Sequence, residues 1–297
     1  MTDRDVEASA RAAFGELQRT ARMSGSNMQS LLTVYAVESF LRRLAISEYA
    51  QHLVLKGGML MAAHSIRRMT RDADLSTHGV RNDEATVAEL VNTINAIEPE
   101  PPDGITFDSA SLRTEGMRED AEYRGVRCRL NAHLAQARIP FALDFSFGDP
   151  HATSFVDLES VLDRPAIALR AYPLTLNLAE KLVTAMQRRE TSTRDRDFAD
   201  IWVSSRRHRM DARALRGHVI DVAEHRRQQV ITMAEALENM PDRQQPYVAM
   251  VQRMSYLSAP PTSWTELLAG IAAFADPLLL DTDGILAGWE PEQLVWK

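Results

Sequence analysis

The amino-acid sequence predicts a bilobed protein in which an α/β lobe is followed by an all-α lobe. Three observations lead to this prediction. Short apolar strands alternate with helical segments up to about residue 165, and the 3.6-residue period of amphipathic helices dominates from about residue 173 onwards. The chain also has 297 residues, which is long for one hydrophobic core and suits two. We therefore expect domains at residues 1–165 and 166–297.

The elements of the first lobe follow from its periodicity. Apolar side chains recur at helical spacing in residues 5–23, 28–45 and 83–96, whereas HLVLK (52–56) and DADLS (72–76) are expected to be short strands. Between these two strands a Gly-Gly pair turns the chain into a further helix. Residues 104–148 alternate as β-strands do, and these strands complete the lobe.

The second lobe is expected to consist of helices joined by short breaks. Polar and proline-containing stretches such as PDRQQP and APPTS separate its periodic segments. These segments cover residues 175–189, 195–205, 211–224, 228–239, 243–257 and 263–275.

Composition excludes several classes of protein. The formal net charge is −7, so the chain is not a uniformly basic nucleic-acid-binding protein, and any polyanion would have to meet a local patch. No apolar run approaches the roughly 20 residues that span a bilayer, and the N-terminus has no apolar signal segment. Cys128 is the only cysteine, which excludes a disulfide framework. We expect a cytoplasmic protein with no membrane partner.

Lysine is rare in this chain. It occurs only at Lys56, Lys181 and Lys297, so 31 of the 34 basic residues are arginines. The two internal lysines therefore indicate positions where a compact ammonium group is favoured over a planar guanidinium.

Asp72 and Asp74 are the first candidates for a chemical role. They are spaced i,i+2 on an expected strand, so both side chains point to the same face. Two carboxylates on one face repel each other unless a cation lies between them, and a hard divalent ion such as Mg²⁺ suits this place. Taken alone, the motif is also compatible with two solvated carboxylates on an exposed strand.

Two further features belong with this pair. In the alternating stretch IPFALDFSFGD (139–149), Ala142, Asp144 and Ser146 share the face opposite the bulky side chains, so Asp144 is a plausible third carboxylate. An exposed or hydrogen-bonded strand acid is the alternative. Gly57 and Gly58 follow a strand and open a helix, where backbone N–H groups can approach a phosphate. A simple turn is the alternative there.

The last candidates lie at the start of the second lobe. Lys181 stands off the centre of the apolar stripe of its expected helix. Asp197 and Asp200 are spaced i,i+3 and share a face of the next helix. Arg194 has the same spacing from Asp197, so an ion pair on the helix surface is the alternative.

Together these motifs resemble the AbiEii/MenT family of nucleotidyltransferases, the toxins of type IV toxin–antitoxin systems. The family pattern joins K-G-G-[ST]-x-L, [RST]-x-D-x-D, a later strand carboxylate, K-L-x-A on a helix and R-D-x-x-D. Met59 stands where the family has Ser or Thr, and the alanine of the lysine motif is displaced by one position. The matching stretches are residues 55–60, 70–74, 144, 181–185 and 196–200.

The resemblance implies a nucleotidyltransferase-type first lobe with a mixed β-sheet, and a helical lobe that contributes Lys181 and Asp200 to the cleft. It implies a Mg²⁺-dependent enzyme that transfers the nucleoside monophosphate of an NTP, with CTP as one candidate, to an RNA acceptor. The favoured acceptor is the 3′ end of tRNA, and its modification would block aminoacylation and translation. A cognate antitoxin protein is the expected partner.

The resemblance also assigns site residues. The metal would be held by Asp72, Asp74 and Asp144, and Lys181 would neutralise the β- and γ-phosphates. The residues expected to act in catalysis are Asp72, Asp74, Asp144, Lys181 and Asp200. Those expected to bind the nucleotide are Lys56, Gly57, Gly58, Thr70, Arg71 and Asp197.

Two other functions remain open from the sequence. A metal-dependent glycosyltransferase also uses D-x-D to hold a nucleotide diphosphate, although it does not need the Gly-Gly pair, Lys181 and the later acid. The other is a non-catalytic nucleotide-binding regulatory protein on the same fold, against which the presence of all three acids argues.

Overall fold

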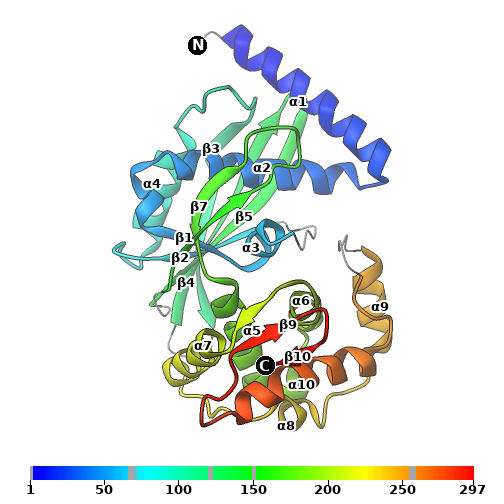
Figure 1. Cartoon of the computed structure of the whole chain (residues 1–297). Helices are drawn as coiled ribbons and strands as arrows, with labels where there is room; N and C mark the ends of the chain where they lie inside the picture. Colours follow the sequence, from blue (N-terminus) through cyan, green and yellow to red (C-terminus); the bar gives the residue numbers. More distant parts are fainter. Residues whose placement is uncertain (1–2, 66–69, 71, 120–122, 149–151, 254–258) are drawn as a thin grey trace. The chain divides into compact units, whose positions relative to one another are not determined.

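The computed structural model describes residues 3–65, 70, 72–119, 123–148, 152–253 and 259–297. Contacts divide the chain into two compact units (Figure 1). Apart from two short connections, unit 1 runs to Ala171 and unit 2 begins at Tyr172. Among the described residues, no helix combines the length and the apolar character needed to cross a membrane.

Unit 1 is built around a seven-stranded mixed sheet with the strand order β3-β4-β5-β2-β1-β7-β6. The pairs β2–β5 and β1–β7 are parallel and the other neighbours are antiparallel, which confirms the predicted mixed sheet. The strands are β1 (Leu53–Lys56), β2 (Asp72–Thr77), β3 (Thr106–Glu119), β4 (Tyr123–Leu134), β5 (Ala137–Phe147), β6 (Ser154–Leu158) and β7 (Ile167–Ala171). The helices are α1 (Asp3–Ser24), α2 (Met28–Ala45), the 3-10 turn η1 (Glu48–Gln51), α3 (Gly57–Ala63) and α4 (Glu84–Asn95).

Helix α2 spans the residues predicted from the sequence, and it is the buried helix of unit 1. It begins at Asn27, whose side chain accepts a hydrogen bond from the Ser30 N–H over 3.0 Å. α2 packs against β5 and β7, α4 packs against β3 and β4, and the two helices contact each other (Figure 1). Both helices therefore cover the same face of the sheet. A buried forked ion pair between Arg43 and Asp103, 2.6 Å at its shortest, ties α2 to the loop before β3.

Strand β5 shows the two faces of this sheet. Its bulky side chains from Ile139 to Phe145 are buried, while Ala142, Asp144 and Ser146 between and beyond them are partly exposed. The alternation predicted for this strand is thus present. It leaves the apolar face to the core and the small and acidic side chains on the opposite face.

Unit 2 is mainly helical, as predicted. Its helices are α5 (Leu174–Arg188), the 3-10 turn η2 (Arg189–Thr191), α6 (Asp195–Arg207), α7 (Ala212–His225), α8 (Met233–Leu237), α9 (Gln244–Arg253) and α10 (Trp264–Leu280). The helix expected over residues 228–239 is shorter, because Thr232 accepts a hydrogen bond from the Glu235 N–H over 3.2 Å and starts α8 there.

Unit 2 also contains a small sheet that the sequence did not predict. The strands β8 (Met210–Asp211), β9 (Gly288–Glu290) and β10 (Val295–Trp296) pair in the order β10-β9-β8. Trp289 and Trp296 pack on Phe274 of α10 with ring centroids 4.9 and 5.5 Å away, and this contact holds the C-terminal strands against the helix. Strands of two or three residues are too short to show an alternating pattern in the sequence.

Candidate functional site

The three candidate carboxylates lie on one face of the unit 1 sheet. In the parallel pair β2–β5, Asp74 stands directly opposite Asp144, and in the antiparallel pair β1–β2 it stands opposite Lys56. Directly opposite residues point to the same face of a sheet, and Asp72 joins them because it precedes Asp74 by two residues. The fold therefore brings together acids from two motifs that lie far apart in the sequence.

The neighbouring positive groups do not fully offset the negative charge of the three carboxylates. The pKa of Asp74 rises from 3.8 to about 6, mainly because burial removes water and also because Asp72 and Asp144 are negative. Lys56 and the Gly58 N–H act in the opposite direction. A divalent cation held by these oxygen atoms would relieve the remaining repulsion.

Sequence reasoning missed the residue that contacts Asp144. Arg127 of β4 lies directly opposite Asp144, and its Nε–H donates to Oδ1 over 2.6 Å while Nη2 donates to Oδ2. Both oxygens of the Asp144 carboxylate are thus bound by one guanidinium, and this contact raises the pKa of Arg127. In the sequence Arg127 appears only as one member of an arginine run.

Charged residues form a continuous row across five strands. In the order β1, β2, β5, β4 and β3, the directly opposite residues are Lys56, Asp74, Asp144, Arg127 and Glu115. The two carboxylates at the centre are therefore flanked by one cation on each side.

Thr70 positions Asp72. Its side chain is buried, and its hydroxyl donates to the Asp72 carboxylate over 2.6 Å. This bond fixes one carboxylate of the cluster, whereas a direct contact of Thr70 with a nucleotide stays a prediction. Arg71, the other expected nucleotide-binding residue in this motif, lies outside the described residues.

Gly57 is required by the close approach of Asp74. Gly57 has a φ of +60°, and a Cβ atom on it would lie 1.9 Å from the Asp74 Oδ2. The next N–H, that of Gly58, donates weakly to the same oxygen over 3.4 Å. The Gly-Gly pair therefore accommodates and orients a carboxylate of the cluster, and its contact with phosphate stays a prediction.

We expect Gly57→Ala to destabilise the protein and lower its activity. Any L-residue at positive φ costs about 1–2 kcal/mol, and here the methyl group would also displace the Asp74 carboxylate. Gly25→Ala is the matched control, because Gly25 has a φ of +67° and nothing beyond its chain neighbours lies within 4 Å of where its methyl group would stand. Urea unfolding should show a clearly larger loss for Gly57→Ala. Equal losses in the two variants would contradict the steric role of Gly57.

In unit 2 the structure brings together Lys181, Asp197 and Asp200. Lys181 of α5 is buried, and its Nζ lies 2.5 Å from the Asp197 Oδ1 and 3.0 Å from the Asp200 Oδ2. Asp200 is fully buried. Arg194 also approaches Asp197, at 3.7 Å, so the ion pair expected from their spacing is present as well. These ion pairs join α5 to α6. Removing either the lysine or the acids would leave the opposite charge uncompensated in a largely buried place.

The described residues provide oxygen donors for a metal but no finished site. Among them, no three His, Cys, Asp or Glu side chains converge in an arrangement that could hold a metal ion. Asp144 is instead bound by Arg127. The carboxylates of Asp72 and Asp74 nevertheless have the chemistry that Mg²⁺ prefers, and the raised pKa of Asp74 fits a place for positive charge.

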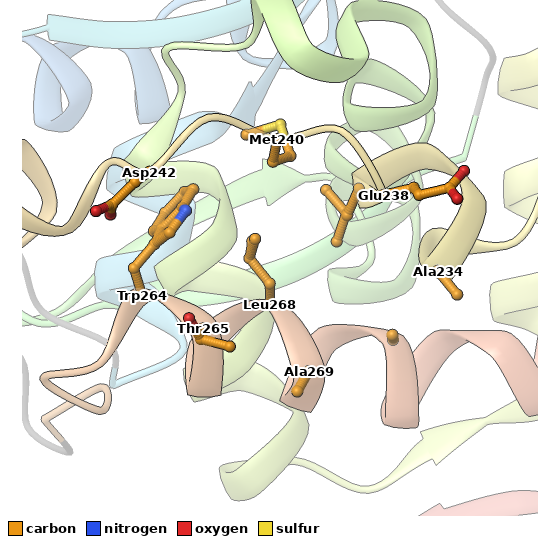
Figure 2. A pocket seen from close by; sticks show the side chains of 10 residues that line it. Ala234, Glu238, Met240, Asp242, Trp264, Thr265, Leu268 and Ala269 are labelled. Carbon is orange, nitrogen blue, oxygen red and sulfur yellow. The ribbon is translucent and has the colours of Figure 1, made fainter.

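A groove of about 420 Å³ lies in unit 2. Figure 2 shows its lining from α8, α10 and the segment that follows α8, with Trp264, Leu268 and Met240 along it and the acids Glu238 and Asp242 at its sides. None of the predicted site residues lines this groove. Its mostly apolar lining is unsuited to phosphoryl-transfer chemistry.

Comparisons with known proteins agree with the motifs. Residues 39–270 match the family described as "Nucleotidyl transferase AbiEii toxin, Type IV TA system", which confirms the resemblance. No curated protein matches the chain.

Two solved structures share the fold. MenT4, a nucleotidyltransferase toxin from Mycobacterium tuberculosis H37Rv, superposes with a TM-score of 0.59 at 18% identity, covering 90% of this chain and 91% of that one. JHP933 from Helicobacter pylori superposes with a TM-score of 0.51 at 13% identity, covering 87% of this chain and 95% of that one. At these identities the likeness establishes the architecture.

Proposed function

Because the chain belongs to the AbiEii family of nucleotidyltransferase toxins, we propose that it transfers the nucleoside monophosphate of an NTP to the 3′ end of tRNA. Membership of this family supports a transferase with a nucleotide substrate and an antitoxin partner. The observation that carries the proposal is the placement of Asp72, Asp74 and Asp144 on one face of the sheet, with Asp74 directly opposite Asp144.

The proposed metal is Mg²⁺, held by Asp72 and Asp74 with Asp144 as a third ligand. When bound, it supplies Lewis-acid stabilisation of the charge on the triphosphate and on the leaving pyrophosphate. Thr70 and the Gly58 N–H orient two of these carboxylates, so the cluster is held in position before the substrate arrives.

The reaction balances as a displacement at the α-phosphorus. The terminal ribose hydroxyl of the acceptor forms the new oxygen–phosphorus bond, the bond between the α-phosphorus and the α–β bridging oxygen breaks, and pyrophosphate leaves. Asp144 is the group that we propose to accept the hydroxyl proton. Lys56 stands beside Asp74 in the row of charges and adds positive charge where the nucleotide would bind.

For unit 2 we propose that Lys181 neutralises the β- and γ-phosphates. Its ammonium group is held by Asp197 and Asp200, so these acids would act as positioning residues for it. This assigns Asp200 a role that the family motif alone did not explain. The domain expected at residues 166–297 would then take part in the same reaction as the first domain.

Transfer to the tRNA 3′ end would block aminoacylation and stop translation, which accounts for toxicity. We propose that the protein acts in the cytoplasm, where tRNA and NTPs are found, and that a cognate antitoxin controls it. The base preference, for CTP or another NTP, would follow from the nucleotide-binding residues.

The first test uses purified protein, Mg²⁺, total tRNA and each of the four α-³²P-labelled NTPs in turn, with Asp72→Ala as the control. We expect label on tRNA with one preferred nucleotide, release of pyrophosphate, and loss of both in the variant. NTP binding without transfer to any RNA would contradict the proposal and favour a non-catalytic role. Transfer of sugar from a nucleotide diphosphate would instead favour a glycosyltransferase.

A further inference from the structure

Arg127 is built into the carboxylate cluster by the register of the sheet. It lies directly opposite Asp144 in the β4–β5 pair, so its guanidinium reaches the Asp144 carboxylate from the neighbouring strand. The side chain of Asp144 is 12% exposed and that of Arg127 is 33% exposed, so the bond is only partly open to water. Two parallel N–H···O bonds from a planar guanidinium also fix the orientation of the carboxylate.

The bond with Arg127 competes with a metal for the lone pairs and the orientation of the Asp144 carboxylate. A metal ligand must turn an oxygen lone pair towards the cation, whereas here the guanidinium takes one lone pair of each oxygen and fixes the plane of the carboxylate. Arg127 also adds a positive charge next to the place where a divalent cation would lie, and like charges at short range repel. Among the described residues, the Asp144 carboxylate is bound by Arg127 and does not converge with two other ligand side chains on one metal position.

We propose that Arg127 is a positioning residue that acts as a built-in counter-cation: it holds Asp144 in the metal-free protein and is displaced when a divalent cation binds at the Asp72–Asp74–Asp144 cluster. The inference rests on the metal-dependent function proposed above. Arg127 then lowers the affinity of the site for the metal. In the metal-free protein its positive charge offsets the repulsion among the three carboxylates. The displaced guanidinium becomes available to an anion such as the nucleotide phosphate.

Arg129 provides a matched control. It lies two residues further along β4, so it shares the strand and the face with Arg127. Its partner is Glu115 of β3, at 2.5 Å, and both side chains of that pair are about half exposed. Replacing Arg129 removes the same charge from the same strand face without freeing Asp144.

The experiment measures the binding of Mn²⁺ alone to the full chain, by electron paramagnetic resonance or calorimetry, at pH 8. We expect Arg127→Gln to bind Mn²⁺ about ten-fold more tightly than the unmodified protein, because a repelling charge and a competing bond are both removed. Arg129→Gln should change the affinity by less than about two-fold, as is usual for exposed charges. An unchanged or weaker affinity in Arg127→Gln, or equal tightening in both variants, would overturn the inference.

A second variant, Arg127→Lys, keeps the inference testable if Arg127→Gln does not fold. Arg127→Lys keeps the positive charge but replaces the two-pronged bond with a single ammonium group, so it should tighten Mn²⁺ binding less than Arg127→Gln does. If Arg127→Gln does not fold, wild-type affinity in Arg127→Lys overturns the inference.

Failure of the inference can be told apart from failure of the proposed function. Mn²⁺ binding is measured without NTP or RNA, so it does not depend on whether nucleotide transfer is the reaction. Mn²⁺ binding that responds to Arg127 without any transfer activity would refute the proposed reaction alone. Transfer activity together with the same Mn²⁺ affinity in Arg127→Gln and the unmodified protein would refute the inference alone.

Discussion

Replacing Asp74 with asparagine is expected to reduce nucleotide transfer strongly and to make the metal-free protein more stable at pH 8. Asp74 would help to hold the metal that stabilises the developing charge, and weakening such stabilisation lowers turnover by about 100- to 1,000-fold. The stability gain has a separate cause, since the Asp74 carboxylate is partly desolvated and is repelled by Asp72 and Asp144, and its pKa is raised to about 6. Asparagine has the same shape but no charge, so it removes this repulsion.

The gain in stability should depend on pH in a defined direction. Asp74 has a pKa of about 6 in the folded protein against 3.8 without the fold, so the folded protein binds its proton more tightly. Charging Asp74 therefore destabilises the fold as the pH rises through this window, and below it the cost disappears. With screening taken into account, we expect Asp74→Asn to add on the order of 1–2 kcal/mol at pH 8 and close to nothing at pH 4.

Urea unfolding in the presence of EDTA measures this difference at the two pH values. Asp157→Asn is the matched control, because it makes the same change at an exposed position of β6, where a surface substitution should change the stability by less than about 0.5 kcal/mol. A variant at position 74 that is less stable than the unmodified protein at pH 8 would contradict the description of the cluster as repulsive.

Replacing Lys181 with methionine is expected to cost unit 2 about 3–5 kcal/mol, because the buried Asp200 and the partly exposed Asp197 would lose the cation that they share. Such a loss alone cannot separate a structural role from a role in binding phosphate. The double change Lys181→Met with Asp200→Asn removes one positive and one negative charge, and should recover most of the stability. Transfer activity should stay absent in the double variant if Lys181 neutralises the triphosphate.

Thermal unfolding and the transfer assay together decide between the two roles. Arg243→Met is a matched control, since it breaks another ion pair of α6, that between Arg243 and Asp195 at 2.6 Å. It should lower stability without abolishing transfer. Recovery of activity along with stability in the double variant would limit Lys181 to a structural role.

Features that depend on local periodicity were predictable from the sequence. Helix α2 follows from its amphipathic pattern and its Asn27 cap, and the shared face of Asp72 and Asp74 follows from the two-residue period of a strand. The face of Asp144 follows in the same way from the bulky side chains that alternate with it on β5. Each of these inferences uses only residues that are close together in the chain.

The role of Arg127 was not predictable, because it depends on strand register. The turn between β4 and β5 consists of Ala135 and Gln136, and Ala135 has a φ of +50°. A two-residue turn usually contains Gly or Asn at such a position, so the sequence has no signal for this hairpin or for its register. Without the register, Arg127 could not be placed opposite Asp144. The steric role of Gly57 was hidden for a similar reason, since it depends on how closely the start of α3 approaches Asp74 of β2.

The central claim is tested most directly by comparing tRNA with an intact 3′ end and tRNA whose terminal ribose has been oxidised by periodate. Both are incubated with purified protein, Mg²⁺ and the preferred α-³²P-labelled NTP. Our account predicts label on the intact tRNA, none on the oxidised tRNA, and none on either with Asp74→Asn. Equal labelling of the two tRNAs would place the modification elsewhere on the acceptor, and labelling by Asp74→Asn would contradict the role of the carboxylate cluster.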